Sequence, residues 1–503
     1  MDEAQARRDR FDGLPIRQAV LRQIVPAIFS QMVVLIYNLA DTYFVGLLNA
    51  PDQTAAVAVS MPAFLMLTAI SNLFAIGGAS QVARQLGKRA PEAASAVSAI
   101  AFWFGLGSAV LFSGFFWCAA SPILQLCGAT AATCAPALAY AKWVIAAGGV
   151  GTVLNILLAN LVRAEGRSLI AAFGVCLGGC VNVVLDPLLI LPRFAGLGAA
   201  GAGLATAVSN TLAALFFLVW LIFGKRRTVL RLSPRYLHQT RQYLADIVRI
   251  GIPASVQYAL TVVSVAALSK FVSGYGTAAV AALGIVKKLD QLPLYFSIGA
   301  SNGLLPLLAY HHAAGNTARR RAAFRFGTAL TVSFSLLCLV AYECFAPQLA
   351  GLFIQDSETI AYGAKFLRLM VVAMPLMSVC YPLIVQFQAM GCARQSLICS
   401  VLRKGVLDIP LLFLLDRLLL LYAGPADRGC GLAGGRVVFL SKAAAGGCAN
   451  RRNSAEQRGR VSAGYTGASG VSGFVTPVRR DGSSPPPKAA PPRAEARRMT
   501  CSP

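Results

Sequence analysis

Charged residues are scarce in this sequence. Of its 503 residues only 13% are charged, while 56% are hydrophobic. Soluble proteins of average composition carry roughly a quarter charged residues. The shortage excludes a soluble enzyme, a disordered regulator and a secreted disulfide scaffold. A channel, a transporter or a membrane-embedded enzyme remains.

Motifs for catalysis and metal binding are also missing. The sequence contains no HExxH, GxSxG or Walker A motif, and no GxGxxG element followed by an acidic partner. ATP-driven pumping and common intramembrane hydrolysis therefore have no support. The 13 cysteines form no CxxC pair, and the three histidines complete no zinc pattern. We expect no enzyme, no cofactor and no metal centre, so an ion gradient must drive any active transport.

Long apolar runs dominate the chain instead. A hydrocarbon core about 30 Å thick requires about 20 apolar residues per helix. About eleven windows reach this length. They are Val20–Leu48, Ala55–Ser80, Ala93–Trp117, Leu138–Leu161, Leu169–Leu191, Gly198–Phe223, Ile247–Val272, Ala278–Leu308, Phe324–Phe345, Ala361–Met390 and Leu397–Tyr422. The sequence thus predicts an all-α polytopic membrane protein.

The net charge of +25 arises from alternate loops and from the C-terminal tail. The basic loops are 84–89, 163–167, 225–241, 319–321 and 394–404. The positive-inside rule places them, and the N-terminus with Arg7, Arg8 and Arg10, in the cytoplasm. Because these charges set topology, we expect the lipid bilayer and not a nucleic acid as the partner of this surface.

The chain also repeats itself. Val25-Pro-Ala and Phe44-Val match Ile252-Pro-Ala and Phe271-Val at one offset, and Thr54-Ala-Ala-Val-Ala recurs at Thr277. Ordered matches of this kind predict two parallel-repeat six-helix lobes. The predicted parts are a cytoplasmic leader (1–18), an N-lobe with spans 1–6 (19–224), a cytoplasmic linker (225–246), a C-lobe with spans 7–11 (247–422) and a basic low-complexity tail (423–503).

Two carboxylates lie inside predicted spans, where an ionised group costs about 2.5–3.5 kcal/mol. Asp41 shares a helical stripe with Gln31 and Asn38, and Tyr37 lies one turn before it. Asp186 follows Asn182 by one turn, so an amide and a carboxylate share one face that could hold a proton or a small cation. Two interpretations are open for each acid: a polar cavity, or a position near the external helix end.

Other residues are candidates for the same cavity. Thr206 and Asn155 belong either to its lining or to ordinary helix packing. Pro26 either bends the first span or lies unstrained near its start. In the C-lobe, Leu268 occupies the position that corresponds to Asp41. Lys287, Lys288 and Asp290 lie either at a helix start or beside a central cavity.

With these residues in place, the chain resembles the multidrug and toxic compound extrusion (MATE) family in its bacterial branch. The resemblance covers about residues 15 to 420. It rests on Tyr37-Asn-Leu-Ala-Asp-Thr-Tyr-Phe-Val-Gly, Gly77-Gly-Ala-Ser, Arg163-Ala-Glu-Gly, Asn182-Val-Val-Leu-Asp-Pro and Gly196-Leu-Gly-Ala-Ala-Gly-Ala-Gly-Leu-Ala-Thr.

The resemblance implies a two-lobe antiporter of the bacterial inner membrane that expels amphipathic cations in exchange for H⁺ or Na⁺. It assigns ion coupling to Asp41, Asn182, Asp186 and Thr206, and helix bending to Pro26. Gln31, Tyr37, Asn38 and Asn155 are expected to line the substrate cavity. The expected coupling ion is H⁺, or Na⁺ bound by Asp41, Asn182 and Asp186. We expect a monomer with its N-terminus in the cytoplasm.

Two departures from the family pattern are visible. Where some members carry an acid in the seventh span, this chain has Gln257. After Tyr422 the family has a twelfth span, whereas here the sequence becomes rich in Gly, Arg and Pro. Pro425–Leu432 can be back-translated with GC-rich codons. Reading that DNA sequence one base out of frame gives a peptide closer to the family pattern. The tail is therefore either out of frame or a natural basic extension that cannot bury a core.

An alternative function is a lipid or lipid-linked oligosaccharide flippase of related two-lobe architecture. A flippase needs a cationic cavity for an anionic headgroup, and Lys287 and Lys288 are the residues that favour it. A passive channel or scaffold is a further alternative, and it predicts flux that does not depend on a proton or sodium gradient.

Overall fold

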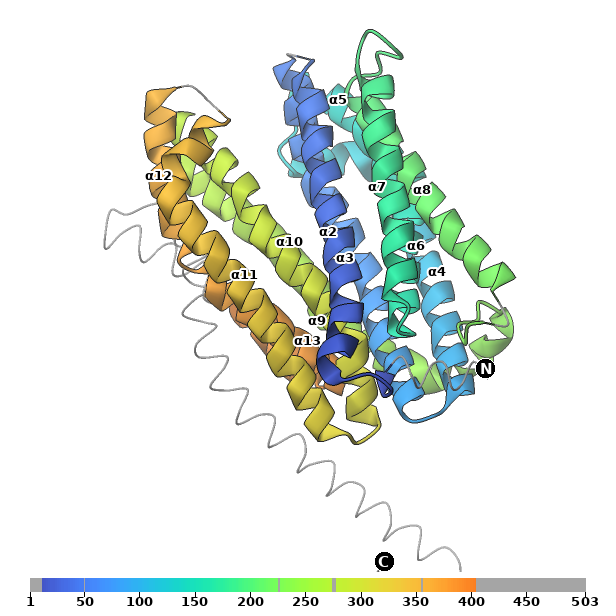
Figure 1. Cartoon of the computed structure of the whole chain (residues 1–503). Helices are drawn as coiled ribbons and strands as arrows, with labels where there is room; N and C mark the ends of the chain where they lie inside the picture. The colour runs from blue at the N-terminus through green and yellow to red at the C-terminus, as the bar shows by residue number, and fades with distance from the viewer. Residues whose placement is uncertain (1–10, 49, 225–226, 274–276, 354–355, 404–503) are drawn as a thin grey trace, which may run out of the picture. The chain divides into compact units, whose positions relative to one another are not determined.

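The computed structural model describes residues 11–48, 50–224, 227–273, 277–353 and 356–403 (Figure 1). Within these ranges the chain forms helices and loops and no strand. The predicted tail 423–503 and residues 404–422 of the last predicted span lie outside the described residues. The chain is an all-α polytopic membrane protein, as its apolar windows predict.

The helices of the first half are α2 (Ile16–Gly46), α3 (Pro51–Gly87), α4 (Pro91–Leu126), α5 (Ala131–Ala141), a π-helix (Lys142–Ala147), α6 (Gly149–Ala164), α7 (Ser168–Ile190) and α8 (Ala199–Phe223). A 3-10 turn (Pro234–Gln239) precedes the second half. Its helices are α9 (Thr240–Ser273), α10 (Thr277–Ala313), α11 (Thr317–Gly351), α12 (Ser357–Val371), α13 (Met374–Met390) and α14 (Ala393–Val401).

Local sequence explains several helix starts. Pro51 and Pro91 occupy the first positions of α3 and α4, where the missing N–H breaks no hydrogen bond. Thr130, Asn316 and Asp356 precede α5, α11 and α12, and each side chain accepts a hydrogen bond from a first-turn N–H. Such caps satisfy backbone donors that the helix itself leaves unpaired.

In the described part of the chain, 8 helices are long and apolar enough to cross a membrane, or up to 10 if each bent pair counts as one span. The bent pairs are Ala131–Ala147 with Gly149–Ala164 (48°) and Thr359–Val371 with Met374–Met390 (45°). They cover the predicted windows Leu138–Leu161 and Ala361–Met390. The eleventh window lies mostly outside the described residues, so the predicted number of spans stays a prediction.

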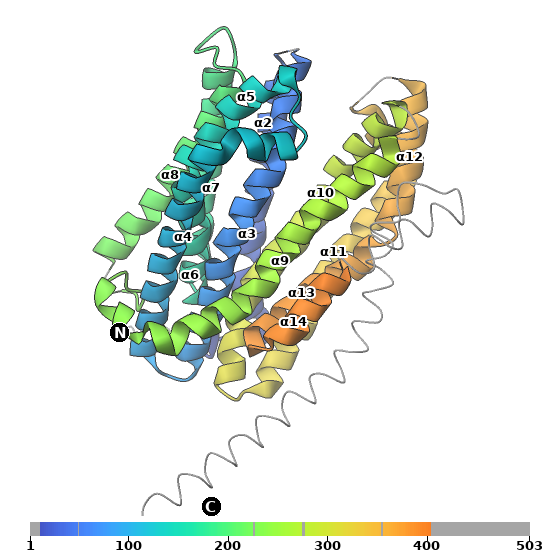
Figure 2. The same ribbon diagram turned by 180° about the vertical axis from the view of Figure 1, so that it is seen from behind.

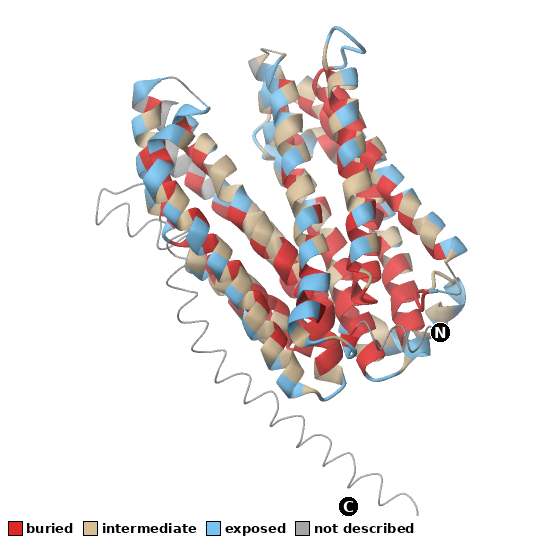
Figure 3. Ribbon diagram, in the orientation of Figure 1, coloured by how far each residue is buried: buried red, intermediate tan, exposed pale blue. Residues whose placement is uncertain are grey.

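Helices pack on one another within each predicted lobe, and α9 and α10 also pack extensively on α3 and α2 of the N-lobe. In the N-lobe, α2 packs on α7, α3 on α4 and α6, and α8 on α6 and α7. In the C-lobe, α10 packs on α11, α12 and α13, and α14 on α9 and α13 (Figures 1 and 2). Buried residues line the surfaces where these helices face each other, and exposed residues lie on the outer faces of the helices (Figure 3).

The repeat seen in the sequence recurs in the structure. Pro26 lies inside α2, and Pro253 lies inside α9. Both α4 and α11 are interrupted by one non-helical residue, Ala119 and Phe345, shortly before a proline. Each half then continues into a bent helix pair. The duplication therefore extends to the irregularities of the helices and not only to their order.

The basic loops meet at one end of the bundle. Arg167 donates a hydrogen bond to the carbonyl of Arg227 in the linker. Arg319, at the start of α11, donates to the carbonyl of Leu14 before α2. We call this end, which carries residues 84–90, 163–167, 227–241 and 314–321, the basic end.

The linker is fastened to the N-lobe at the basic end. The buried Glu165 carboxylate accepts hydrogen bonds from the Thr228 hydroxyl (2.5 Å) and the Val229 N–H (3.0 Å). Ser98 of α4 bonds the Arg231 backbone. The last residues of the predicted linker, 240–246, are helical and belong to α9.

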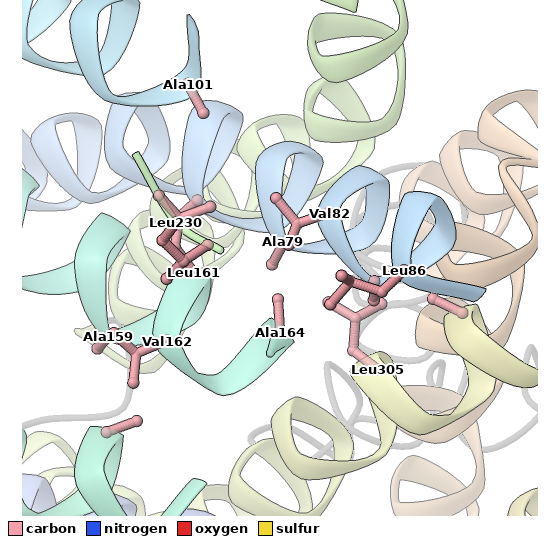
Figure 4. Packing of buried hydrophobic residues seen from close by; sticks show 14 of the residues in the cluster. Ala79, Val82, Leu86, Ala101, Ala159, Leu161, Val162, Ala164, Leu230 and Leu305 are labelled. Atoms are coloured by element: carbon pink, nitrogen blue, oxygen red, sulfur yellow. The ribbon is translucent and has the colours of Figure 1, made fainter. Parts of the chain in front are cut away.

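The lobes are joined by hydrogen bonds and by a shared apolar cluster. Ser255 of α9 donates to the carbonyl of Ala69 of α3 (2.6 Å), and Ser80 of α3 donates to the carbonyl of Gln388 of α13 (2.7 Å). Leu86 of α3 and Leu305 of α10 belong to one buried apolar cluster (Figure 4). All described residues form part of one compact unit.

Glycines allow this close approach. A Cβ on Gly251 of α9 would lie 1.8 Å from the carbonyl oxygen of Leu73 of α3. A Cβ on Gly299 or Gly303 of α10 would lie 2.7 Å from backbone atoms of α2. Only a residue without a Cβ lets two helix backbones lie this close.

Candidate functional site

Two helix faces meet between α2 and α7. Val33, Tyr37 and Asp41 recur every four residues on α2, and Gly179 lies one turn before Asn182 on α7. A Cβ on Gly179 would lie 2.6 Å from Val33 Cγ1 and 3.2 Å from Tyr37 Cδ1. The glycine therefore lets the Tyr37 face of α2 lie directly against the α7 face that carries the predicted amide and acid.

The predicted pair on α7 forms. The Asn182 amide nitrogen donates a hydrogen bond to Asp186 Oδ1 at 3.3 Å. Both side chains are buried, with exposed fractions of 1% and 0%. Asp186 is buried within α7, which continues to Ile190, so the helix does not end at Asp186.

Asp41 of α2 lies close enough to Asp186 for the two carboxylates to interact electrostatically. Asp41 Oδ1, Asp186 Oδ2 and Asn182 Oδ1 are buried acceptor atoms that have no hydrogen-bond donor in the described structure. An unpaired buried acceptor is costly unless a proton or cation satisfies it. These three oxygens are therefore suited to bind a proton or a small cation.

Tyr140 is a neighbour of this acidic site that we did not predict. Tyr140 is the residue before Ala141, the last residue of α5. It is 4% exposed and interacts electrostatically with both Asp41 and Asp186. The π-helix Lys142–Ala147 follows directly; such segments are frequent at functional sites. The sequence did contain a signal, because Ala139-Tyr-Ala-Lys is repeated as Ala361-Tyr-Gly-Ala-Lys.

Thr206 and Asn155 belong to a neighbouring polar network. The Asn155 amide nitrogen donates to Asn210 Oδ1 of α8 at 2.8 Å. Asn210 donates in turn to the backbone carbonyl of Thr206 at 3.1 Å. The structure thus joins these two predicted residues through Asn210, and it connects Thr206 by its backbone and not by its hydroxyl.

The remaining predicted residues of the N-lobe lie on α2. Gln31 is half-buried. Asn38 donates to the Val34 carbonyl of its own helix (2.8 Å) and interacts electrostatically with Tyr295 of α10, so it reaches the C-lobe. Pro26 is inside a helix that starts at Ile16 and continues to Gly46.

At the C-lobe position that corresponds to Asp41, the chain has Leu268, which is buried in an apolar cluster. Lys287, Lys288 and Asp290 lie within α10, well after its start at Thr277, and are half-buried. This excludes the helix start, and a place beside a central cavity stays a prediction for these residues. No group of three or more His, Cys, Asp or Glu side chains in the described ranges could hold a metal ion.

Comparisons with known proteins agree with this architecture. A family model described as MatE matches residues 26–188 and 253–414, and these two ranges begin at the repeated prolines. The multidrug export protein MepA of Staphylococcus saprophyticus is 28% identical over 437 residues, which covers 86% of this chain and 95% of that protein.

Two solved structures share the fold. A MATE protein crystallised in complex with MaL6 has a TM-score of 0.82 at 24% identity, covering 90% of this chain and 100% of that chain. An outward-facing multidrug resistance MATE transporter of the MOP superfamily has a TM-score of 0.80 at 24% identity, covering 88% and 96%.

Proposed function

The chain belongs to the MatE family, and on this premise we propose that it exports amphipathic organic cations in exchange for H⁺ or Na⁺. It is a membrane transporter of the multidrug export type and not an enzyme. The proposal adds the chemical class of substrate and the mode of coupling.

The acidic site carries this proposal. Asp41 and Asp186 place two carboxylates on neighbouring helices, and each has a buried oxygen without a donor. Because the two carboxylates interact electrostatically, the state in which both are ionised is disfavoured. Binding of a proton or Na⁺ would relieve this repulsion, and so would an organic cation, which makes the two kinds of cation natural competitors.

Exchange follows if the cation also changes the preference of the protein for one conformation. A ligand shifts a conformational equilibrium only by its difference in affinity for the two states. Asn38, on the same helix as Asp41, reaches Tyr295 of the C-lobe. A change of charge at Asp41 is therefore positioned to alter a contact between the lobes.

For topology, we propose that the basic end faces the cytoplasm of a bacterial inner membrane, with the N-terminus on that side. The asymmetry of Lys and Arg among the loops supports this orientation. We propose a monomer as the transporting unit, since the acidic site is built from α2, α5 and α7 of one chain.

The central test is Asp41→Asn, measured by export of ethidium from cells and by counterflow in proteoliposomes. We expect export to fall to the level of cells without the protein, because Asn removes the ionisable group and keeps the shape. The matched control is Asp52→Asn, which changes an exposed acid in the first turn of α3. Unchanged export in correctly inserted Asp41→Asn protein would refute the assignment of coupling to this site.

The coupling ion is identified in proteoliposomes with one imposed gradient at a time. A pH gradient or a Na⁺ gradient alone should drive accumulation of ethidium, and its collapse by nigericin or monensin should stop it. Equal flux with and without either gradient would instead indicate a passive pathway and would rule out antiport.

A further inference from the structure

The residues just before α2 contact the other lobe. Phe11 is 0% exposed, and its ring stacks on that of Tyr310 in α10 with centroids 4.4 Å apart and planes 8° from parallel. A stacked pair that excludes water so completely holds its two elements together. We call residues 11–14, which lead into the N-cap Pro15, the latch segment.

Polar contacts fix the latch segment to the same C-lobe surface. Asp12 Oδ2 accepts a hydrogen bond from the Tyr310 hydroxyl at 2.8 Å, and Asp12 Oδ1 lies 3.6 Å from Nδ1 of the buried His311. The Arg319 guanidinium donates to the carbonyls of Phe11 (3.3 Å) and Leu14 (2.7 Å). The Asp12 side chain is therefore bound by α10, and the backbone of the latch segment is bound by α11.

Phe11 contacts the N-lobe as well. A Cβ on Gly166, in the loop between α6 and α7, would lie 3.0 Å from Phe11 Cζ. Gly166 has a φ of +82° and its carbonyl accepts a hydrogen bond from Gln23 of α2 at 2.9 Å. The Phe11 ring therefore lies between an N-lobe loop and a C-lobe helix.

The latch segment lies where the lobes come closest. A Cβ on Gly87 of α3 would lie 2.3 Å from the Tyr310 carbonyl oxygen, and a Cβ on Gly303 would lie 2.7 Å from Gln23 of α2. Any conformation in which the lobes separate at the basic end must move Tyr310 and Gly303 away from α3 and α2. Because the latch segment is covalently joined to α2, its contacts with Tyr310, His311 and Arg319 cannot all survive that movement.

We propose that residues 11–14 form a latch that stabilises the conformation closed at the basic end, and that the latch must release from α10 and α11 in every transport cycle. The functional meaning of this release rests on the proposed exchange function, which requires the cavity to open alternately at both ends. The latch itself is a statement about conformation and is tested without any substrate.

The experiment measures the distance between the lobes at the basic end. Spin labels are attached through non-canonical ketone residues at Glu92 and Ala318, two exposed positions on α4 and α11, because the native cysteines preclude thiol labelling. Double electron–electron resonance in nanodiscs then reports the short (closed) and long (open) populations. We expect Phe11→Ala to raise the ratio of long to short distances by roughly tenfold, since it removes contacts made only in the closed state.

Tyr310→Phe keeps the ring and removes the hydroxyl that binds Asp12, so it should shift the same ratio in the same direction by a smaller factor. Phe194→Ala, which changes an exposed ring in the loop after α7, is the control and should leave the distribution unchanged. If Phe11→Ala does not fold, Tyr310→Phe decides alone. A folded variant with an unchanged distribution, or with more of the short distance, overturns the latch. If the unsubstituted chain does not export ethidium, that result counts against the proposed exchange function and not against the latch.

Discussion

At the scale of single residues, Gly179 sets the separation of the two faces that form the acidic site. Its missing Cβ leaves room for Val33 and Tyr37. The same stretch of α7 carries Asn182 and Asp186. The site therefore depends on a residue that has no chemistry of its own, because a few tenths of an ångström at Gly179 change the position of Tyr37.

We predict that Gly179→Val disrupts the site. The added carbons overlap Val33 Cγ1, and overpacking of this kind costs about 1–3 kcal/mol. Thermal unfolding in detergent should shift to lower temperature, and ethidium export should be lost. Gly114→Val is the matched control, since a Cβ there meets nothing within 4 Å. Equal effects of the two substitutions would show that helix propensity, and not the contact with α2, is responsible.

The sequence revealed part of this site and missed another part. Asp41 and Asp186 were identifiable because a charge inside an apolar window is rare and costly. Tyr140 and Tyr295 were not, because tyrosine has an apolar body and a polar tip and fits either a core or a cavity. Only tertiary packing decides which, and here α5 packs on α3 and α8 while α10 packs on α2. The roles assigned to these side chains remain predictions.

At the scale of helices, the repeat was predictable and the bends were not. Leu138–Leu161 and Ala361–Met390 are each one continuous apolar window, yet each contains a bend of 48° or 45°. The length of an apolar window indicates whether a segment can cross the membrane, but it carries no information on changes in the direction of the helix axis. The bend in the first half lies between a π-helix and α6 at Gly148 and Gly149, and π-helical turns and glycines are common causes of helix kinks.

The crossing of α3 and α9 gives a prediction at this scale. A Cβ on Gly251 would overlap the Leu73 carbonyl oxygen, and a helix backbone cannot rotate aside as a side chain can. Gly251→Ala should therefore separate α9 from α3 and lengthen the Glu92–Ala318 distance measured by spin labels. Gly107→Ala, where a Cβ meets nothing within 4 Å, should leave that distance unchanged. A distance that stays short in Gly251→Ala would mean that this contact does not hold the lobes together.

At the scale of the whole molecule, the two halves are alike within the residues that the structure describes, which end at residue 403. The family model matches the first half from Pro26 and the second from Pro253, and its second match ends at residue 414. The predicted boundaries of leader, lobes, linker and tail remain predictions. A lobe of six helices is closed by its sixth span, and in the N-lobe α8 packs on α6 and α7 in that role.

The second half lacks an apolar window where a sixth span would correspond to α8. Residues 423–503 are rich in Gly, Arg and Pro, a composition that cannot bury a core or cross a bilayer. We predict that the gene carries a one-base shift near the codons for Tyr422 to Leu432. Resequencing from the codon for Leu397 to beyond the stop codon checks this directly. A corrected frame should encode an apolar run of about 20 residues after Tyr422. If the printed frame stands, the second lobe has to be completed in another way, and ethidium export by this chain must be measured before any coupling is assigned to it.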